Sequence, residues 1–227
     1  MELKNWKDYL LQVSLIIVSL FIAFGVERCN QRVKDNRKLS TYLDAIHEEL
    51  TDELRSSRMN LRDCENDIED LYIGAATFSM SDEAKLPEGI GQTGQVFVRG
   101  VFRSFSPTSY ELMADAGDAL LIKELSLRQR LASIVAFRND YIKNDLQKHD
   151  DLTLHTLEKV STYIDINCVR NVEPIEYATC VTDRERLRQQ GAADLSALLR
   201  HAELRAFHLE LYIDQVQEVT ALVDQAR

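Results

Sequence analysis

The stretch that decides the fold is YLLQVSLIIVSLFIAFGV, residues 9–26, which contains 18 residues and no charged side chain. As a helix rising about 1.5 Å per residue it is about 27 Å long, close to the roughly 30 Å hydrocarbon core of a bilayer. Trp6 and Tyr9 lie at one end of it, where aromatic side chains prefer the membrane interface. No glycine or proline turn follows it. We therefore expect a transmembrane anchor, residues 1–26, whose helix continues into a second domain, residues 27–227.

A cleaved secretory signal is the alternative to an anchor. Residues 23–25 (AFG) place small side chains at the −3 and −1 positions of a cleavage site, and Lys4 and Lys7 supply positive charge before the apolar run. However, the run is longer than the usual 7 to 15 or so residues of a signal peptide. Glu2 and Asp8 also dilute the positive charge. The sequence therefore favours an uncleaved anchor.

Composition indicates long helices and excludes one class of partner. The chain has only 8 glycines and 3 prolines in 227 residues, with 28% charged residues, which predicts few turns. The 37 acidic and 27 basic residues give a net charge of −10, which repels the phosphates of nucleic acids. We expect the lipid bilayer as a partner and no nucleic acid.

Apolar residues recur at spacings of three and four in three long segments, the pattern of amphipathic helices. The stripes are Leu39, Leu43, Ile46, Leu50, Leu54, Ser57, Leu61, Cys64, Ile68, Leu71 and Ala75; then Leu127, Leu131, Ile134, Tyr141, Leu146, His149, Leu152, Leu157, Val160 and Ile164; then Leu195, Leu198, Ala202, Leu209, Tyr212, Val216 and Val223. Each stripe must be buried against a partner. The prediction is an all-α, antiparallel helical bundle, in which the anchor helix continues through residue 76 and packs against helices near residues 125–166 and 193–225.

Two connections interrupt these helices. The insert 78–106 holds four of the eight glycines and has no helical period, and residues 94–102 alternate weakly enough to suggest a strand or hairpin. The hairpin is disfavoured because no further strands exist for it to join. The second connection, residues 167–183, contains a proline and two cysteines and is expected to be a loop.

Two blocks of sequence resemble one family. Trp6, residues 27–32 (ERCNQR) and residues 42–50, with Tyr42 and Glu49, are similar to the start of small single-pass bacterial membrane proteins of uncharacterised function. The second block, which we name the corner motif, consists of Phe105, Pro107, Tyr110, Gly117, Leu121, Ile122, Leu127 and Arg128. Ala116 and Ala119 depart from the family's serine and leucine. The resemblance implies a bacterial, membrane-anchored, helical protein, and it brings no activity or catalytic residue with it.

The corner motif has a structural and a functional interpretation. Ser106 and Pro107 read as the N-cap and first residue of a short helix that Gly117 ends. Arg128 falls in the first turn of the next helix, where a cation opposes the helix dipole unless Glu111 or Glu124 neutralises it. A helix corner is the favoured interpretation, and a ligand pocket around residues 97–122 is the alternative.

Catalytic and metal sites have no signature in this chain. The histidines are His47, His149, His155, His201 and His208, and no Glu-x-x-His pair of the di-iron type accompanies them. P-loop, Gly-x-Ser-x-Gly and His-Glu-x-x-His motifs are also absent from the sequence. We therefore assign no catalytic, cofactor-binding or metal-binding residue. His149 falls on an apolar stripe, which favours a core or boundary residue over a pH sensor.

Cysteines and basic residues point to opposite compartments. Cys168 and Cys180 lie in one loop, and a disulfide between them would be worth about 3 kcal/mol. The residues after the anchor favour a cytoplasmic domain, because positive charge stays inside. These residues are Arg28, Arg32, Lys34, Arg37 and Lys38. Long domains translocate largely regardless of charge. We favour an extracytoplasmic domain on the bacterial cytoplasmic (inner) membrane, with Cys168 and Cys180 bonded.

Self-association is also predicted. Ser19 and Ala23 form a small-xxx-small pair on one face of the anchor, which permits close approach of two helices. The stripe from Val33 to Ile46 extends beyond the shorter helices, and would pair with a second copy unless the C-terminal helix covers it. The predicted function is a membrane-anchored interaction, scaffold or sensor protein with an unknown protein partner. The alternative is a small-ligand sensor or enzyme with a pocket around residues 97–122.

Overall fold

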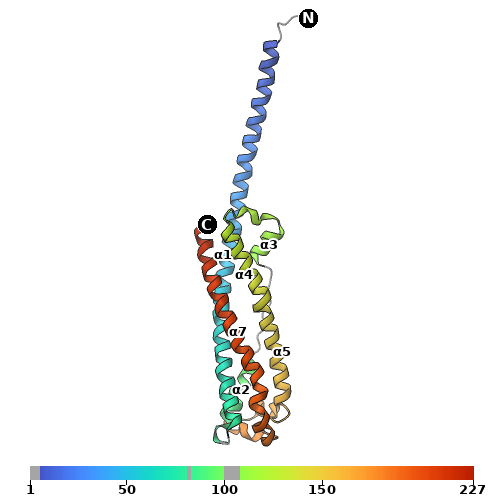
Figure 1. The fold of residues 1–227 in the computed structure, drawn as a ribbon, viewed down its shortest axis with the longest axis vertical. Coiled ribbons are helices and arrows are strands. Elements are labelled where there is room, and N and C mark those ends of the chain that lie inside the picture. The colour runs from blue at the N-terminus through green and yellow to red at the C-terminus, as the bar shows by residue number, and fades with distance from the viewer. Residues whose placement is uncertain (1–5, 81–82, 100–107) are drawn as a thin grey trace.

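A computed structural model describes residues 6–80, 83–99 and 108–227 of the chain. Its long elements are all helices, which confirms the all-α prediction (Figure 1). They are α1 (Trp6–Ser79), α2 (Leu86–Val98), α3 (Ser109–Asp115), α4 (Leu125–Phe137), α5 (Lys143–Val160), α6 (Ile166–Asn171) and α7 (Arg184–Ala226), with short turns η2 (Glu83–Lys85), η3 (Asp118–Leu121), the π-helical η4 (Arg138–Ile142) and η5 (Pro174–Cys180). Within these ranges the β-type pairing is a single bridge between Ile164 and Val181.

Helix α1 carries the apolar stretch and the first helix of the bundle without a break. Its first part projects alone beyond the other helices (Figure 1). The apolar side chains of this part, such as Phe21 and Phe24, are exposed. Among the described helices, α1 is the one that is long and apolar enough to cross a membrane. A helix with apolar residues on every face needs an apolar surrounding, as a bilayer provides.

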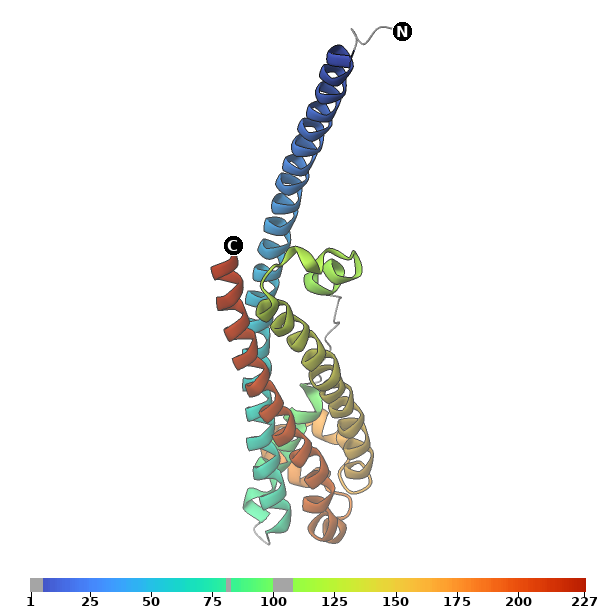
Figure 2. The ribbon, with the colours of Figure 1, turned by 45° about the horizontal axis from the view of Figure 1, so that its top comes forward.

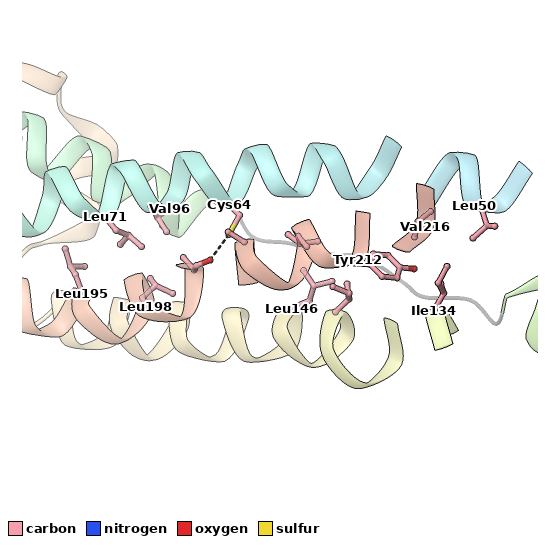
Figure 3. Close-up of a cluster of buried hydrophobic side chains, with 14 of the residues drawn as sticks. Leu50, Cys64, Leu71, Val96, Ile134, Leu146, Leu195, Leu198, Tyr212 and Val216 are labelled. Carbon is pink, nitrogen blue, oxygen red and sulfur yellow. Dashed lines mark hydrogen bonds between the residues drawn. The ribbon is translucent and has the colours of Figure 1, made fainter. Parts of the chain in front are cut away.

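Helix α7 runs back along α1, and α4, η4 and α5 form a nearly continuous rod that packs against α7 (Figure 2). Core side chains from these helices pack together along the bundle (Figure 3). Within this core, the Sγ of Cys64 donates to the carbonyl of Ala202 at 3.1 Å. The direction of the α4–α5 rod differs from the sequence prediction, which made it antiparallel to the first helix. The α4–α5 rod runs parallel to α1, because α2 and the segment after it return the chain to the anchor-proximal end before α4 begins (Figure 2).

The insert 78–106 is more regular than its sequence suggested. Residues 94–98 belong to helix α2, so the strand interpretation was wrong there; residues 100–102 lie outside the described ranges. The helix packs closely on α1, since a Cβ built at Gly89 would lie 2.6 Å from Thr77. Glycine lowers the local stability of a helix, but it allows α2 to pack closely against α1. The free energy of this packing offsets the low helix propensity of glycine.

The corner between α3 and α4 is held by short-range polar contacts. Thr108 is the N-cap of α3 and forms a capping box with Glu111, so the N-cap is Thr108 and not Ser106 as the sequence predicted. Phe105, Ser106 and Pro107 lie outside the described ranges. Gly117 follows with φ of +76°, a left-handed conformation that glycine adopts without strain. Leu121, Ile122 and Leu127 of the corner motif then lead into α4, with Ile122 and Leu127 buried.

The acidic partner expected for Arg128 does not lie beside it. Arg128 donates to the carbonyl of Ile122 at 3.1 Å, and Tyr110 donates to the carbonyl of Arg128, also at 3.1 Å. Glu111 instead accepts from the buried Arg138 at 3.1 Å. The described residues of the corner motif thus connect α3 to α4 through η3, and the helix-corner interpretation of the whole motif stays a prediction.

Most of the membrane-proximal stripe is covered by the chain itself. Leu43 and Ile46 are buried, so the expectation of an unpaired seam was wrong for these two residues. The C-terminal end of α7 reaches this level, where Arg227 contacts Asp44 at 2.8 Å. Val33 remains 50% exposed, which restricts any intermolecular seam to the part of α1 nearer the anchor.

Candidate functional site

A cavity of about 240 Å³ lies at the end of the bundle farther from the anchor. We call it the distal cavity. Its walls are α2, the end of α5, and the segment from α6 to η5. It is lined by Ile90, Gly91, Thr93, Gly94, Gln95, Phe97, Val98, Leu157, Val160, Ile164, Ile166, Val169, Arg170, Val172 and Tyr177. Most of these side chains are apolar, as in sites that bind small molecules.

Helix α2 forms one wall of the distal cavity, and its glycines leave the space next to this wall open. A proline in its first turn sets its direction, and Leu86 and Ile90 anchor it in the core. A Cβ built at Gly94 would meet no atom within 4 Å, and one at Gly91 would lie 3.3 Å from the ring of Tyr177. Side chains at these positions would fill the cavity.

The opposite wall is closed by the disulfide between Cys168 and Cys180, whose Cα atoms are 5.5 Å apart. The sequence singled out these two cysteines, and the structure joins them. Asp165 caps α6 by accepting from the amide of Cys168 at 3.1 Å, and its own amide donates to the carbonyl of Cys180 at 2.8 Å. The segment expected to be a loop is therefore two short helices held together covalently.

Polar groups at the distal cavity are few. Among its described lining residues, Arg170 is the one cation, and it makes no ion pair within the described chain. The Tyr177 ring and the Gln95 amide complete the polar rim. The buried hydroxyl of Thr93 faces α1 instead, since a Cβ built at Gly74 would lie 2.1 Å from its oxygen. A single cation beside apolar walls suits a ligand with one anionic group.

A second cluster, the buried charge cluster, lies where α1, α2 and α5 meet, with one residue from α7. It consists of Asp67, Asp70, Arg99, His149 and Arg205. Arg99, at the end of α2, contacts Asp67 at 2.7 Å and makes a short contact with Asp70. His149 of α5 lies 3.8 Å from the second oxygen of Asp67. Side chains from α2 and α5 therefore meet at one carboxylate of α1.

Burial controls the protonation of this cluster. It lowers the pKa of His149 to about 3, with further lowering by the positive charge of Arg205. Burial also raises the pKa of Asp67, against the opposing effect of Arg99. The neighbouring thiol of Cys64 has its pKa raised to about 11 by burial, which leaves it protonated and unreactive.

Arg205 is the least expected member of the cluster. Its side chain is 1% exposed, and its three guanidinium nitrogens have no hydrogen-bond partner in the described part of the chain. Its charge acts through space on Asp67, His149 and Cys64. Arginine is rarely fully buried without pairing, so this position carries a cost that the bundle must offset.

Sequence reasoning missed this cluster, although a signal for it existed. The third apolar stripe jumps from Ala202 to Leu209, and Arg205 occupies the skipped position, three residues after one and four before the other. Asp67 also lies three residues after Cys64 and four before Leu71, although Ile68 fills the stripe beside it. A charged residue in register with an apolar stripe predicts a buried charge.

The other residues nominated by sequence lie apart from the distal cavity. Phe97 lines the distal cavity, whereas the described residues of the corner motif lie at the anchor-proximal end of the bundle. The described part of residues 97–122 therefore does not form a single pocket. Ser19 and Ala23 are exposed on the projecting part of α1. No grouping of three or more metal-ligating side chains occurs in residues 6–80, 83–99 and 108–227. Comparison with family models, curated proteins and solved structures finds no match.

Proposed function

We propose that this chain is a single-pass protein of the bacterial cytoplasmic membrane whose extracytoplasmic helical domain binds a small ligand and acts as a sensor. The observation that carries the proposal is the distal cavity, a mostly apolar space of about 240 Å³ walled by a disulfide-bonded segment. Disulfides persist in oxidising compartments, which favours the extracytoplasmic side. The bacterial assignment follows from the family resemblance of the anchor and the corner motif.

The cavity favours a small acid with an apolar body. An apolar cavity of about 150 Å³ is enough to bind benzene, so this larger space suits a ligand with one ring or a short chain and one polar end. Arg170 at the rim would pair with a carboxylate. The net charge of the chain is −10 and repels an anion at long range, so the attraction of a carboxylate to the cavity depends on Arg170.

Helix α2 couples the distal cavity to the helix that continues into the membrane anchor. One of its faces lines the cavity, and the other packs against α1 at Gly74 and Thr77. Its end is tied to Asp67 and Asp70 of α1 through Arg99. A ligand that shifts α2 would therefore shift the helix that continues into the anchor, which is the coupling that a sensor requires.

Calorimetry on the full-length protein in phosphatidylcholine nanodiscs tests the proposal. The probes are phenylacetate and its neutral analogue phenylacetamide. We expect phenylacetate to bind more tightly, and Arg170→Gln to reduce its affinity about tenfold, to that of the amide. Gly94→Leu should abolish binding of both probes by filling the cavity. Arg200→Gln, an exposed arginine outside the cavity, is the control. Undiminished binding to Gly94→Leu, or no binding to the unaltered protein, would contradict the proposal.

A protein-docking scaffold is the second candidate, favoured by an exposed apolar face on α7. Leu204, Phe207 and Leu211 lie at helical spacing on this face and are 45%, 54% and 39% exposed. Such a face suits an apolar surface of a partner protein. Affinity purification of the full-length protein in mild detergent, compared with Phe207→Asp, tests it. A protein captured by the unaltered chain and lost from the variant would support the scaffold.

A further inference from the structure

A second hollow, of about 400 Å³, lies at the opposite end of the bundle, between α1 and the corner that contains η3. It is lined by Arg32, Asp35 and Leu39 from α1 and by Leu120, Leu121 and Lys123 from the corner. We call it the proximal hollow. Figure 2 shows this corner at the end of the bundle from which the apolar part of α1 projects.

Along α1, the hollow lies next to the polar layer of a bilayer, on the side away from the hydrocarbon core. Arg32 follows the last residue of the apolar stretch by six positions, or about 9 Å along the helix. The headgroup layer on each side of the hydrocarbon core is about 5 to 8 Å thick. The hollow therefore begins just beyond this layer and extends away from the membrane, and the long side chain of Arg32 can reach back to the lipid phosphates.

The charge of the hollow suits an anion. Arg32 and Lys123 make no ion pair within the described residues. Asp35 also lines the hollow and accepts from the Gln31 amide at 2.8 Å, and its negative charge offsets one of the two cations. The lining thus carries a net positive charge in a chain whose overall charge is −10.

The corner is held against α1 by contacts outside the hollow. Asp118 pairs with Lys38 at 2.5 Å and accepts from the hydroxyl of Tyr42 at 2.9 Å. The left-handed conformation of Gly117 turns the chain so that Asp118 reaches both partners. The two cations are therefore presented from a fixed frame, which lowers the entropy cost of binding.

We propose that the proximal hollow binds the phosphate of an anionic phospholipid, with Arg32 and Lys123 as its cationic partners. The proposal rests on the membrane anchoring in the proposed function, and it does not depend on a ligand in the distal cavity. Leu120, which is 76% exposed at the rim, contacts the interfacial part of the same lipid. The corner motif thereby gains a role beyond turning the chain, because it holds Lys123 and Leu120 beside the bilayer.

Native mass spectrometry of the full-length protein in detergent tests this assignment. Phosphatidylglycerol and phosphatidylcholine are added separately, and bound lipids are counted. We expect preferential binding of phosphatidylglycerol, and a decrease of about fivefold for each cation removed in Arg32→Gln and Lys123→Gln. The double variant Arg32→Gln with Lys123→Gln is compared with Arg62→Gln with Lys148→Gln, which removes the same two charges from exposed positions elsewhere and should bind as the unaltered protein does. Leu120→Asp should weaken binding without changing the fold.

Three results would overturn the assignment. The first is equal binding of the two lipids, and the second is an equal loss in the control variant. The third is binding of glycerol 3-phosphate as tight as that of phosphatidylglycerol, which would identify the site as one for a free phosphate. Resistance of each variant to alkaline extraction from membranes is checked first. A loss of lipid binding in an inserted protein then bears on the hollow alone, and not on the anchor or the distal cavity.

Discussion

Asp67 of α1 and Arg99 at the end of α2 form an ion pair of 2.7 Å inside the bundle, where Asp67 is 1% exposed. The pair joins the helix that lines the distal cavity to the helix that continues into the anchor. A buried carboxylate that loses its cationic partner is strongly destabilising, because its desolvation is no longer compensated. This contact therefore ties the cavity-lining helix α2 to α1.

Arg99→Gln should lower the free energy of unfolding by about 2 kcal/mol, below the usual range for a buried pair because the Arg99 side chain is 29% exposed. Urea unfolding of the full-length protein, followed by circular dichroism, measures the change. Arg55→Gln is the matched control, since its pair with Asp52 is exposed on both sides and should contribute less than about 0.5 kcal/mol. Equal effects of the two substitutions would contradict the role given to Arg99.

Stability should fall as the pH is lowered from 7 toward 4, because of His149. Its pKa is lowered to about 3 in the folded protein, so below pH 6.5 the unfolded chain takes up a proton that the folded chain does not. The loss at pH 5 is about 2 kcal/mol. The raised pKa of Asp67 acts in the opposite sense above pH 3.8, and it offsets part of this slope. His149→Gln should flatten the pH dependence of urea unfolding; an unchanged slope would exclude His149 as its cause.

The disulfide should stabilise both the domain and its distal cavity. Replacing Cys168 and Cys180 together by serine should cost about 3 kcal/mol, from the closure of a loop with a sequence separation of 12. Phenylacetate binding should weaken in the same variant, since the cavity wall is released. Cys29→Ser, at an exposed free cysteine, is the control. Alkylation of unreduced native protein reports the bond directly. If mass spectrometry finds both thiols free, the extracytoplasmic placement is wrong.

Two glycines should respond in opposite directions to alanine. Gly117→Ala should destabilise the protein by about 1 kcal/mol, because φ of +76° is strained for a residue with a Cβ. Gly94→Ala should stabilise it by about 0.5 to 1 kcal/mol, since the position is helical and a Cβ there meets nothing within 4 Å. Thermal unfolding of both variants in one buffer gives the comparison. A stabilising Gly117→Ala would show that the corner does not require this conformation.

Self-association through the anchor should be visible at Cys29, which is exposed where α1 leaves the apolar stretch. Mild oxidation of membranes should produce a dimer linked through this cysteine, because parallel helices packed at Ser19 and Ala23 bring two copies together. Replacing Ser19 and Ala23 by isoleucine should abolish the dimer, whereas Ser14→Ile, on another face of the helix, should not. A protein that stays monomeric under these conditions would exclude the interface.

Local patterns were enough to predict the elements with strong periodicity. The uncharged run of residues 9–26 and the stripe beginning at Leu39 predicted a single helix through the anchor, and α1 confirms its continuity. Gly117 likewise marked the end of a short helix. These features depend on residues a few positions apart, which is the range over which helical spacing and turn preferences act.

Helix α2 shows where local patterns failed. Its glycines at 89, 91 and 94 argued against a helix, yet they face α1 and the distal cavity, where the absence of a side chain is what the packing requires. The value of a glycine there depends on α1 and on Tyr177, which are distant in sequence. Propensity alone could not include that contribution.

By itself, the sequence determined an apolar anchor, three amphipathic helices, a helix corner at Gly117 and a pair of cysteines able to bond. Only the tertiary structure decided that Arg99 meets Asp67, that Arg205 is buried between helices, and that α2, α5 and the disulfide segment enclose a cavity. The physical reason is the range of the interactions. Helical period and turn geometry are set by neighbouring residues, whereas ion pairing, burial and enclosed space depend on which faces of distant helices come together.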